Sequence, residues 1–227
     1  MRIGTHNAEK RRKAESLLEV IVSIFVIALG SAAATGLVIS ALQSNALSRD
    51  NLQALNLATE GIEAVRNIRD SNWIKFAYDK QSCWNMQATK DECKADNVID
   101  NGNYTLTLDT STMKWTLTSG GTAPLDLNNA TYDSSNYQLA YMDVDTGADS
   151  DMDGDPTNDH DMYVAKSGTL PLSKFYRMIN IAYPAVAPPT VDQELTVTSL
   201  VQWKDRGLVH EVRLVSKLTN YQKIKVK

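Results

Sequence analysis

The hydrophobic pattern divides the chain into one long apolar run and a series of shorter alternating runs. Residues 20–42 read VIVSIFVIALGSAAATGLVISAL, with no charged residue and no proline. A helix over these residues would be about 35 Å long, which is enough to cross a bilayer core of about 30 Å. No second run of this kind occurs in the sequence. The pattern therefore predicts one membrane-spanning helix near the N-terminus.

The helical spacing of apolar residues continues beyond this run. Between residues 46 and 69 they recur every three or four positions, and the charged residues lie largely on other faces. The recurring positions are Leu52, Leu55, Ala58/Thr59, Ile62, Val65 and Ile68/Arg69. This spacing is typical of an amphipathic helix with one buried stripe. We therefore expect one helix over residues 15–72, about 85 Å long, whose second half packs on a folded domain.

Beyond Trp73 the spacing changes to the alternation that is typical of half-buried β-strands. Residues 74–100 are polar and are expected to form a loop or a short helix. Strands are predicted over 104–108, 113–118, 138–144, 175–183, 194–203 and 208–218. The expected fold is α+β, in which the long helix packs on an antiparallel β-sheet domain formed by residues 73–227.

The last two predicted strands form a hairpin with one apolar face. The apolar positions are Leu195, Val197, Val201 and Trp203 on the first strand and Val212 and Leu214 on the second. Between the strands, residues 204–207 read Lys-Asp-Arg-Gly and predict the turn. Gly207 stands where such a turn needs a positive φ.

Charge is distributed unevenly along the chain. Residues 1–14 hold five basic residues and one acidic residue, so the net charge of −4 becomes −8 without them. A basic segment directly before a single apolar helix places the N-terminus in the cytoplasm and the C-terminal domain outside. The acidic remainder argues against direct nucleic-acid binding, which needs a positively charged surface.

Cys83 and Cys93 are the only cysteines, and they lie ten positions apart in a polar stretch. Outside the cytoplasm such a pair is expected to form a disulfide that closes a short loop. The alternative is two free thiols. A zinc site is not expected, because a four-coordinate zinc ion needs more ligands than this stretch offers.

An aspartate-rich segment over residues 143–161 separates two predicted strands. Its candidate ligands for calcium are Asp149, Asp151, Asp153, Asp155, Asp159 and Asp161. Acids on alternate residues of a tight turn can supply several of the six to eight oxygen ligands that Ca²⁺ takes. The segment lacks the glutamate that usually stands at the twelfth position of an EF-hand loop, and no helical pattern flanks it. Calcium binding is therefore one interpretation, and a solvated acidic loop is the other.

Glu19 lies one residue before the apolar run. A carboxylate at this depth in a membrane is costly, so it is expected to have a partner or a function. The alternative is an acid at the start of a helix, where the helix dipole favours negative charge.

The sequence around Glu19 carries a further signal. A small residue follows the basic cluster and precedes the apolar run, whereas a secretory signal peptide has its small residues after that run. The block from Ala14 to Val22, AESLLEVIV, resembles the cleavage and methylation motif of type IV prepilins and pseudopilins. The resemblance implies that a prepilin peptidase removes the leader, residues 1–14, by cutting between Ala14 and Glu15 and methylates the new amine. The family usually has glycine and phenylalanine at the positions of Ala14 and Glu15.

The resemblance also implies a fold and an assembly. Pilins have a lollipop shape, with a long helix that is membrane-spanning in its first half. In a filament of such helices, the Glu19 carboxylate would pair with the Glu15 amine of a neighbouring subunit. The implied partners are the prepilin peptidase, other pilin subunits, the inner-membrane assembly machinery and the membrane itself.

The function expected from this resemblance is structural. The chain would be a minor pilin or pseudopilin in a type IV pilus-like filament that serves adhesion, DNA uptake, motility or secretion. It would be a single-pass membrane protein that reaches the pilus or cell surface after assembly. The alternative is a membrane-anchored, calcium-dependent binding module at the cell surface. An enzyme is not expected, because the three histidines lie apart and none stands beside a candidate nucleophile.

Overall fold

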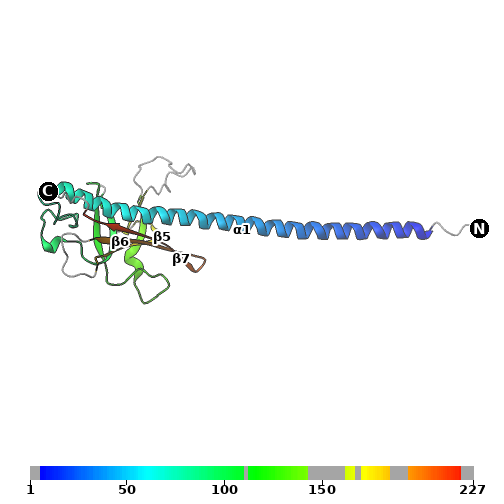
Figure 1. Cartoon of the computed structure of the whole chain (residues 1–227). Helices are drawn as coiled ribbons and strands as arrows, with labels where there is room; N and C mark the ends of the chain where they lie inside the picture. The colour runs from blue at the N-terminus through cyan, green and yellow to red at the C-terminus, as the bar shows by residue number, and fades with distance from the viewer. Residues whose placement is uncertain (1–5, 110–111, 143–161, 167–169, 185–193, 221–227) are drawn as a thin grey trace, which may run out of the picture. The chain divides into compact units, whose positions relative to one another are not determined.

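The computed structural model describes residues 6–109, 112–142, 162–166, 170–184 and 194–220 (Figure 1). The chain divides into two compact units, residues 1–50 and residues 51–227. One helix, α1 (His6–Lys75), contributes to both units. It covers the predicted range of 15–72, ends three residues later than expected, and includes residues 6–14 of the predicted leader.

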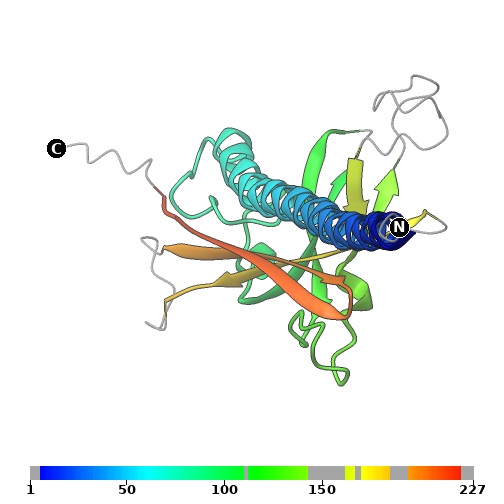
Figure 2. The same cartoon turned by 90° about the vertical axis from the view of Figure 1, so that its right-hand side faces the viewer.

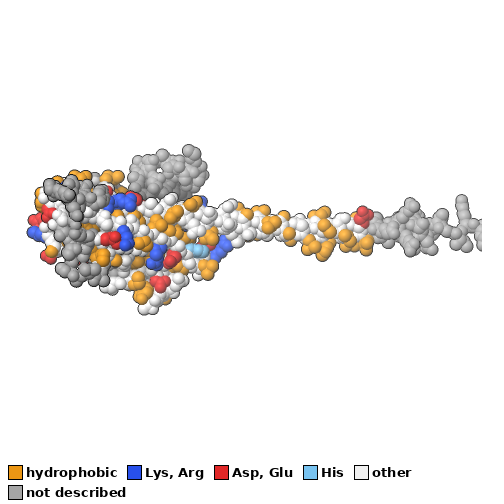
Figure 3. Space-filling view, viewed as in Figure 1, with side chains coloured by type: hydrophobic (Ala, Val, Ile, Leu, Met, Phe, Trp, Pro, Cys, Tyr) orange, Lys and Arg blue, Asp and Glu red, His pale blue; other side chains and the backbone are white. Residues whose placement is uncertain are grey.

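In the first unit the side chains of α1 are exposed over residues 17–46, whereas Leu47 is half-buried and Asp50 is buried. Figure 3 shows hydrophobic side chains along this part of the helix. In the second unit α1 packs on a β-sheet, which Figure 2 shows beside the helix axis. The α+β prediction, with the second half of the helix packed on an antiparallel sheet, is therefore confirmed.

The sheet has seven strands, and every pairing between them is antiparallel. The strands are β1 (Gly102–Asp109), β2 (Lys114–Gly121), β3 (Gln138–Met142), β4 (Met162–Ala165), β5 (Leu172–Ala182), β6 (Leu195–Asp205) and β7 (Leu208–Leu218). Two short 3-10 helices, η1 (Ala95–Asn97) and η2 (Ser134–Tyr137), complete the described elements. The six predicted strands are present, whereas β4 was not predicted because its four residues are too few to establish an alternating pattern.

Strand β5 is the centre of this sheet. It pairs with β6 along one edge, and with β3 and then β1 along the other. Strand β7 lies outside β6, β2 lies outside β1, and β4 lies outside β3. The long hairpin of β6 and β7 places its predicted apolar face inward, because Leu195, Val197, Val201 and Trp203 are at most 1 % exposed. On β7, Val212 and Leu214 are half-buried between exposed neighbours.

The buried stripe of α1 differs from the prediction at its N-terminal end. Leu52 and Leu55 are exposed, whereas Ala54, Leu57 and Ala58 are buried against the sheet. The small side chains of Ala54 and Ala58 let the helix approach the strands closely, and Leu57 packs in the same cluster, whereas Leu52 and Leu55 lie on the exposed side of the helix. From Ile62 onward the predicted stripe is correct: the buried residues Ile62, Val65 and Ile68 belong to the main core cluster.

The turn between β6 and β7 consists of Arg206 and Gly207. Both have positive φ, 49° and 83° respectively. Two-residue hairpin turns of this kind have the twist that suits antiparallel strands. The predicted position of Gly207 is confirmed, but the left-handed conformation of Arg206 was not expected, because side chains other than glycine, asparagine and aspartate rarely adopt it.

Candidate functional site

The apolar part of α1 in the first unit meets the requirements of a membrane span. Within the helix from Leu17, an 18-residue window reaches a mean hydropathy of 2.3, and none of it is buried in the structure. Large side chains such as Leu37 and Ile27 are 73 % and 67 % exposed. The segment is long and apolar enough for a single-pass anchor, and burial in lipid would remove this apolar surface from water.

Hydroxyl groups within this segment bond to the helix itself. Ser23 donates a hydrogen bond to the Glu19 carbonyl oxygen at 2.7 Å, Ser31 to that of Ile27 at 2.8 Å, and Thr35 to that of Ser31 at 2.9 Å. Polar groups in the hydrocarbon region must find partners within the protein. The hydroxyl groups of these three side chains therefore already have hydrogen-bond acceptors within the helix and would need none from the membrane.

Glu19 is different. Its side chain is exposed, and no ion pair joins it to another side chain in the part of the chain that the structure describes. Four aliphatic residues, Leu17, Leu18, Val20 and Ile21, surround it in sequence and are all more than half exposed. The carboxylate thus stands on an apolar helix surface without a described counter-charge. A charge in this setting needs a counter-charge when water is removed.

Ala14 and Glu15 belong to α1, but their side chains lie outside the described part of the structure. Cleavage between them and methylation of the new amine stay predictions. Gly30 and Gly36, farther along the helix, have no atom within 4 Å of an added Cβ, so this side of the helix is open at both positions.

In the second unit, Gly61 lies where α1 approaches the sheet closely. A Cβ at this position would lie 2.5 Å from Ser199 Oγ and 2.6 Å from Ile179 Cδ1. Real Cβ atoms do not approach other atoms so closely, so glycine permits the contact between α1 and strands β5 and β6. The cost of a glycine in a helix interior is offset here by packing that the sequence pattern alone does not reveal.

A buried ion pair lies one residue from this contact. Arg177 on β5 is 2 % exposed, and its Nη1 lies 3.0 Å from Oε1 of Glu60 on α1. The same nitrogen donates to the carbonyl oxygen of Leu57 at 3.4 Å. Nε and Nη2 of Arg177 have no hydrogen-bond partner among the described residues. The pair therefore fixes the position of the helix on the sheet through one contact between opposite charges.

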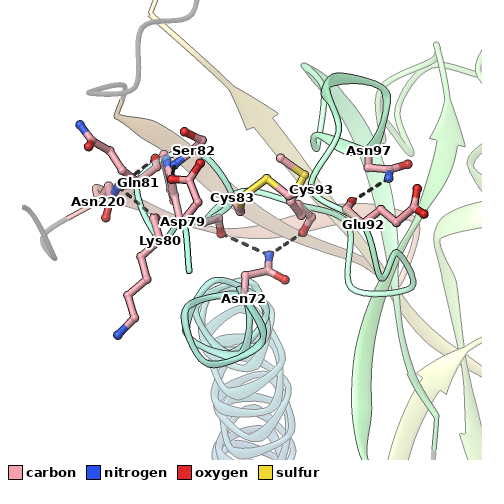
Figure 4. Close-up of a disulfide and its surroundings, with 12 residues drawn as sticks. Asn72, Asp79, Lys80, Gln81, Ser82, Cys83, Glu92, Cys93, Asn97 and Asn220 are labelled. Atoms are coloured by element: carbon pink, nitrogen blue, oxygen red, sulfur yellow. Dashed lines mark hydrogen bonds between the residues drawn. A yellow bond between two sulfur atoms is a disulfide. The ribbon is translucent and has the colours of Figure 1, made fainter. Parts of the chain in front are cut away.

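The C-terminal end of α1 is joined to a disulfide-closed loop (Figure 4). Cys83 and Cys93 are bonded, with their Cα atoms 5.5 Å apart, so the predicted disulfide is present. Asn72 is buried, and its Nδ2 donates to the carbonyl oxygens of Trp84 at 3.2 Å and Met86 at 2.7 Å. The buried amide of Asn72 thus finds its acceptors in the loop, and these two hydrogen bonds join the end of the helix to the loop.

Two further side chains, those of Tyr183 and Lys75, anchor this part of the chain. Tyr183, just after β5, donates to the carbonyl oxygen of Ile99 at 2.8 Å and accepts from Asn85 Nδ2 at 3.0 Å. Burial of this phenol raises its pKa to about 12, so it stays protonated and can donate at neutral pH. At the other side of the loop, Lys75 Nζ lies 2.7 Å from Asp91 and holds the pKa of that exposed carboxyl below its ordinary value.

The predicted calcium ligands, residues 149–161, lie outside the described residues, so calcium binding stays a prediction. Among the residues that are described, no group of three or more histidine, cysteine, aspartate or glutamate side chains could hold a metal ion.

If the acidic loop binds calcium, millimolar Ca²⁺ should raise the melting temperature of the purified protein. A ligand at about 100 times its Kd stabilises the folded state by about 2.7 kcal/mol. The shift should disappear in Asp151→Asn/Asp153→Asn and should not occur with Mg²⁺, which requires a more rigid octahedral site. An unchanged melting temperature at millimolar Ca²⁺ would exclude the calcium interpretation.

Comparison with known proteins adds no family assignment. No family model, no curated protein and no solved structure matches the chain.

Proposed function

We propose that the chain is a prepilin, a structural subunit of a type IV pilus-like filament of the minor pilin or pseudopilin type. The observation that carries the proposal is Glu19, a single carboxylate without a described counter-charge at the head of an exposed apolar helix. The motif around it, with a basic leader and a small residue before the apolar run, supports the same assignment.

The proposed mechanism has two steps that use the same helix. In the membrane, the apolar part of α1 anchors the chain, with the basic N-terminus in the cytoplasm and the sheet domain outside. A prepilin peptidase cuts between Ala14 and Glu15 and methylates the new amine. In the filament, the apolar helices of neighbouring subunits exchange lipid contacts for contacts with one another.

Glu19 gives this assembly its axial register. Its carboxylate pairs with the cationic amine of Glu15 in the neighbouring subunit. Because an isolated charge in an apolar bundle is strongly unfavourable, a register that leaves either group unpaired is excluded. The pair thus selects one axial position for each incoming subunit, even where its net contribution to stability is small.

Replacing Glu19 with alanine tests this proposal. Glu19→Ala should insert into the membrane as the unchanged chain does, because the substitution removes a charge from the apolar segment. It should be absent from sheared filaments, since the variant subunit lacks the carboxylate that would pair with the Glu15 amine of its neighbour and select the axial register. Immunoblots of membrane and filament fractions from the source cell measure both quantities.

Glu63→Ala is the matched control. Glu63 lies on the same helix but is exposed in the second unit, where it pairs only with Arg66. This variant should enter filaments normally. Normal incorporation of Glu19→Ala would contradict the assembly role, whereas failure of membrane insertion in both variants would indicate misfolding.

A further inference from the structure

Strand β7 forms an open edge of the sheet. In the described part of the chain it pairs only with β6, and no backbone group of its eleven residues bonds to a described loop. Beyond its C-terminal end, Asn220 donates to the carbonyl oxygens of Lys80 at 3.3 Å and Gln81 at 3.1 Å. An edge strand presents unpaired N–H and C=O groups that can pair with another strand. We define the open edge as residues 209–215, which read Val-His-Glu-Val-Arg-Leu-Val.

The two-residue turn before β7 determines which of its backbone groups point away from β6. Asp205 and Leu208 flank the turn and face each other, so they form the first hydrogen-bonded pair of the hairpin. Hydrogen-bonded pairs alternate with non-bonded pairs along an antiparallel ladder, so the even-numbered residues of β7 bond to β6. The odd-numbered residues of the open edge therefore direct their N–H and C=O groups outward.

The same odd-numbered residues carry their side chains on the face of the sheet opposite α1. Glu211 and Arg213 are 50 % and 55 % exposed, and Val215 is 60 % exposed. The even-numbered residues Val212 and Leu214 lie on the other face, where they pack against the cluster that includes helix residues. The outward backbone groups and the exposed side chains thus belong to one set of residues.

This set is self-complementary about Val212. If two copies of β7 pair antiparallel with Val212 opposite Val212, Glu211 of each copy faces Arg213 of the other. Val209 of each copy then faces Val215 of the other. The backbone permits this register, because every outward-bonding residue meets another outward-bonding residue. Cross-strand pairs of opposite charge and of apolar side chains stabilise a sheet. A centre one residue away would instead place two glutamates or two arginines opposite each other.

The charges of the open edge identify the partner. Edge strands commonly carry charged side chains that prevent pairing with another chain. On β7 the two charges have opposite signs and lie at equal distances from Val212, so they attract each other in a pair of identical strands. Within one copy, Glu211 and Arg213 lie 3.9 Å apart and are both exposed, so their own ion pair contributes little to stability. The complementary partner is a second copy of this chain.

We propose that the open edge of β7 joins two copies of the chain, with Val212 opposite Val212, into one continuous antiparallel sheet. This is strand addition, in which main-chain hydrogen bonds supply affinity and side-chain pairs supply specificity. The inference uses only residues of the second unit and does not depend on the proposed function. It adds a contact between sheet domains to the contacts between apolar helices that the proposed function requires.

The symmetry of this contact limits its size. A pair in which each copy uses the same surface closes after two copies and does not propagate. In the second unit α1 runs in the same direction as β7, because Ala54 packs in the cluster of Val212 and Ile68 packs in that of Leu218. Antiparallel β7 strands therefore place the α1 residues of the two second units in opposite directions. The product is a two-fold dimer of sheet domains.

A single cysteine at the centre of the open edge tests the register in the full-length chain in detergent. In the proposed dimer the two residues at position 212 form a non-hydrogen-bonded pair, whose Cα atoms are about 4.5 Å apart. A disulfide spans Cα separations of about 4.4–6.8 Å, so Val212→Cys should give a cross-linked dimer on mild oxidation. The two native cysteines are bonded to each other and do not compete.

Ser216→Cys is the matched control. Ser216 is half-buried on the same face of the same strand. In the proposed register it lies opposite residue 208 of the other copy, so the two introduced thiols are far apart. This variant should remain monomeric on a non-reducing gel under the conditions that cross-link Val212→Cys.

Charge variants in the Val212→Cys chain test the cause of the pairing. Glu211→Arg makes both charged cross-strand pairs repulsive and should lower the initial rate of cross-linking by roughly tenfold. Arg213→Glu should have a similar effect for the same reason. The exchange Glu211→Arg/Arg213→Glu restores opposite charges and should restore the rate. Damage to the strand itself would add up in the exchanged variant, whereas a charge effect between copies cancels.

The outcomes decide the inference without reference to prepilin processing. Cross-linking at position 212 that each charge variant lowers and the exchange restores would support the dimer. Absence of cross-linking at position 212, or equal cross-linking at positions 212 and 216, would overturn it. Cross-linking at position 212 that ignores the charge variants would overturn it as well. Association through the apolar helices alone gives no preference for position 212 and no response to these charges.

Discussion

Glu60→Gln is expected to lower the free energy of unfolding by about 3 kcal/mol. The substitution keeps the shape of the side chain but removes the carboxylate 3.0 Å from the buried Arg177, which is its only ion-pair partner among the described residues. Leaving one member of a buried pair as an isolated charge destabilises proteins by about 3–5 kcal/mol. The lower end of this range applies because about a third of the Glu60 side chain remains exposed.

The effect is measured by urea denaturation or thermal melting of the purified chain in detergent. For a domain of this size, 3 kcal/mol corresponds to a decrease in melting temperature of roughly 6–12 °C. Arg177→Met is the matched control, because it replaces the buried charge with an apolar group and leaves the partly solvated Glu60 behind. It should cost less than half as much as Glu60→Gln. Equal losses in the two variants would show that the buried charge does not govern this contact.

Gly61→Leu should be comparably destabilising, for a steric reason. The first side-chain atom would already lie 2.5 Å from Ser199 Oγ and 2.6 Å from Ile179 Cδ1. The side chains of Ser199 and Ile179 would have to shift, and the remaining atoms of the leucine would press α1 away from strands β5 and β6, so the core cluster around Ile62 and Ile179 would lose packing. Overpacking of a close contact typically costs about 1–3 kcal/mol and occasionally more. Leucine has a higher helix propensity than glycine, so propensity alone predicts the opposite sign.

Two controls make this measurement decisive. Gly36→Leu places the same substitution in the same helix where no atom lies within 4 Å of the added Cβ, so it should not destabilise the sheet domain. Gly61→Ala should fall between the unchanged chain and Gly61→Leu, because only one carbon must be accommodated. If Gly61→Leu is as stable as the unchanged chain, then the helix does not require glycine at its approach to the sheet.

The sequence was sufficient for the features that depend on local periodicity. The apolar run, the helix that continues beyond it and the β6–β7 hairpin each repeat over many residues, and each is present as expected. The disulfide between Cys83 and Cys93, which was expected for a cysteine pair outside the cytoplasm with two free thiols as the alternative, is also present. Local spacing carries this information because helix and strand geometry fix which positions share a face.

Contacts between distant parts of the chain could not be predicted in this way. Glu60 and Arg177 stand on elements far apart in sequence, and no pattern around either residue indicates the other. From helix propensity alone, Gly61 would only weaken the helix, because the sequence does not show that strands β5 and β6 approach it. The exposed positions of Leu52 and Leu55 have the same origin. Helical spacing identifies a stripe, but the shape of the sheet decides which side of that stripe is buried.

In the candidate site, too, the local features could be predicted from the sequence and the contacts with distant groups could not. Glu19 was identified because a charge at the edge of an apolar run conflicts with its surroundings, and the structure places it exposed, with no described counter-charge. The pairing with Glu15 of a neighbouring subunit is a contact between two molecules, which a single chain does not display. The predicted calcium ligands lie outside the described residues. Processing between Ala14 and Glu15 is therefore the step on which the functional proposal depends most directly.

Mass spectrometry of the mature N-terminus is the most direct measurement of that step. The full-length chain is expressed with a prepilin peptidase, purified from membranes and sheared filaments, and digested for peptide mapping. The proposal predicts an N-terminal peptide that begins at Glu15 and carries one methyl group on its amine, in both fractions. A chain that keeps residues 1–14 in the presence of an active peptidase, or one that is cut after the apolar run, would contradict the assignment as a prepilin.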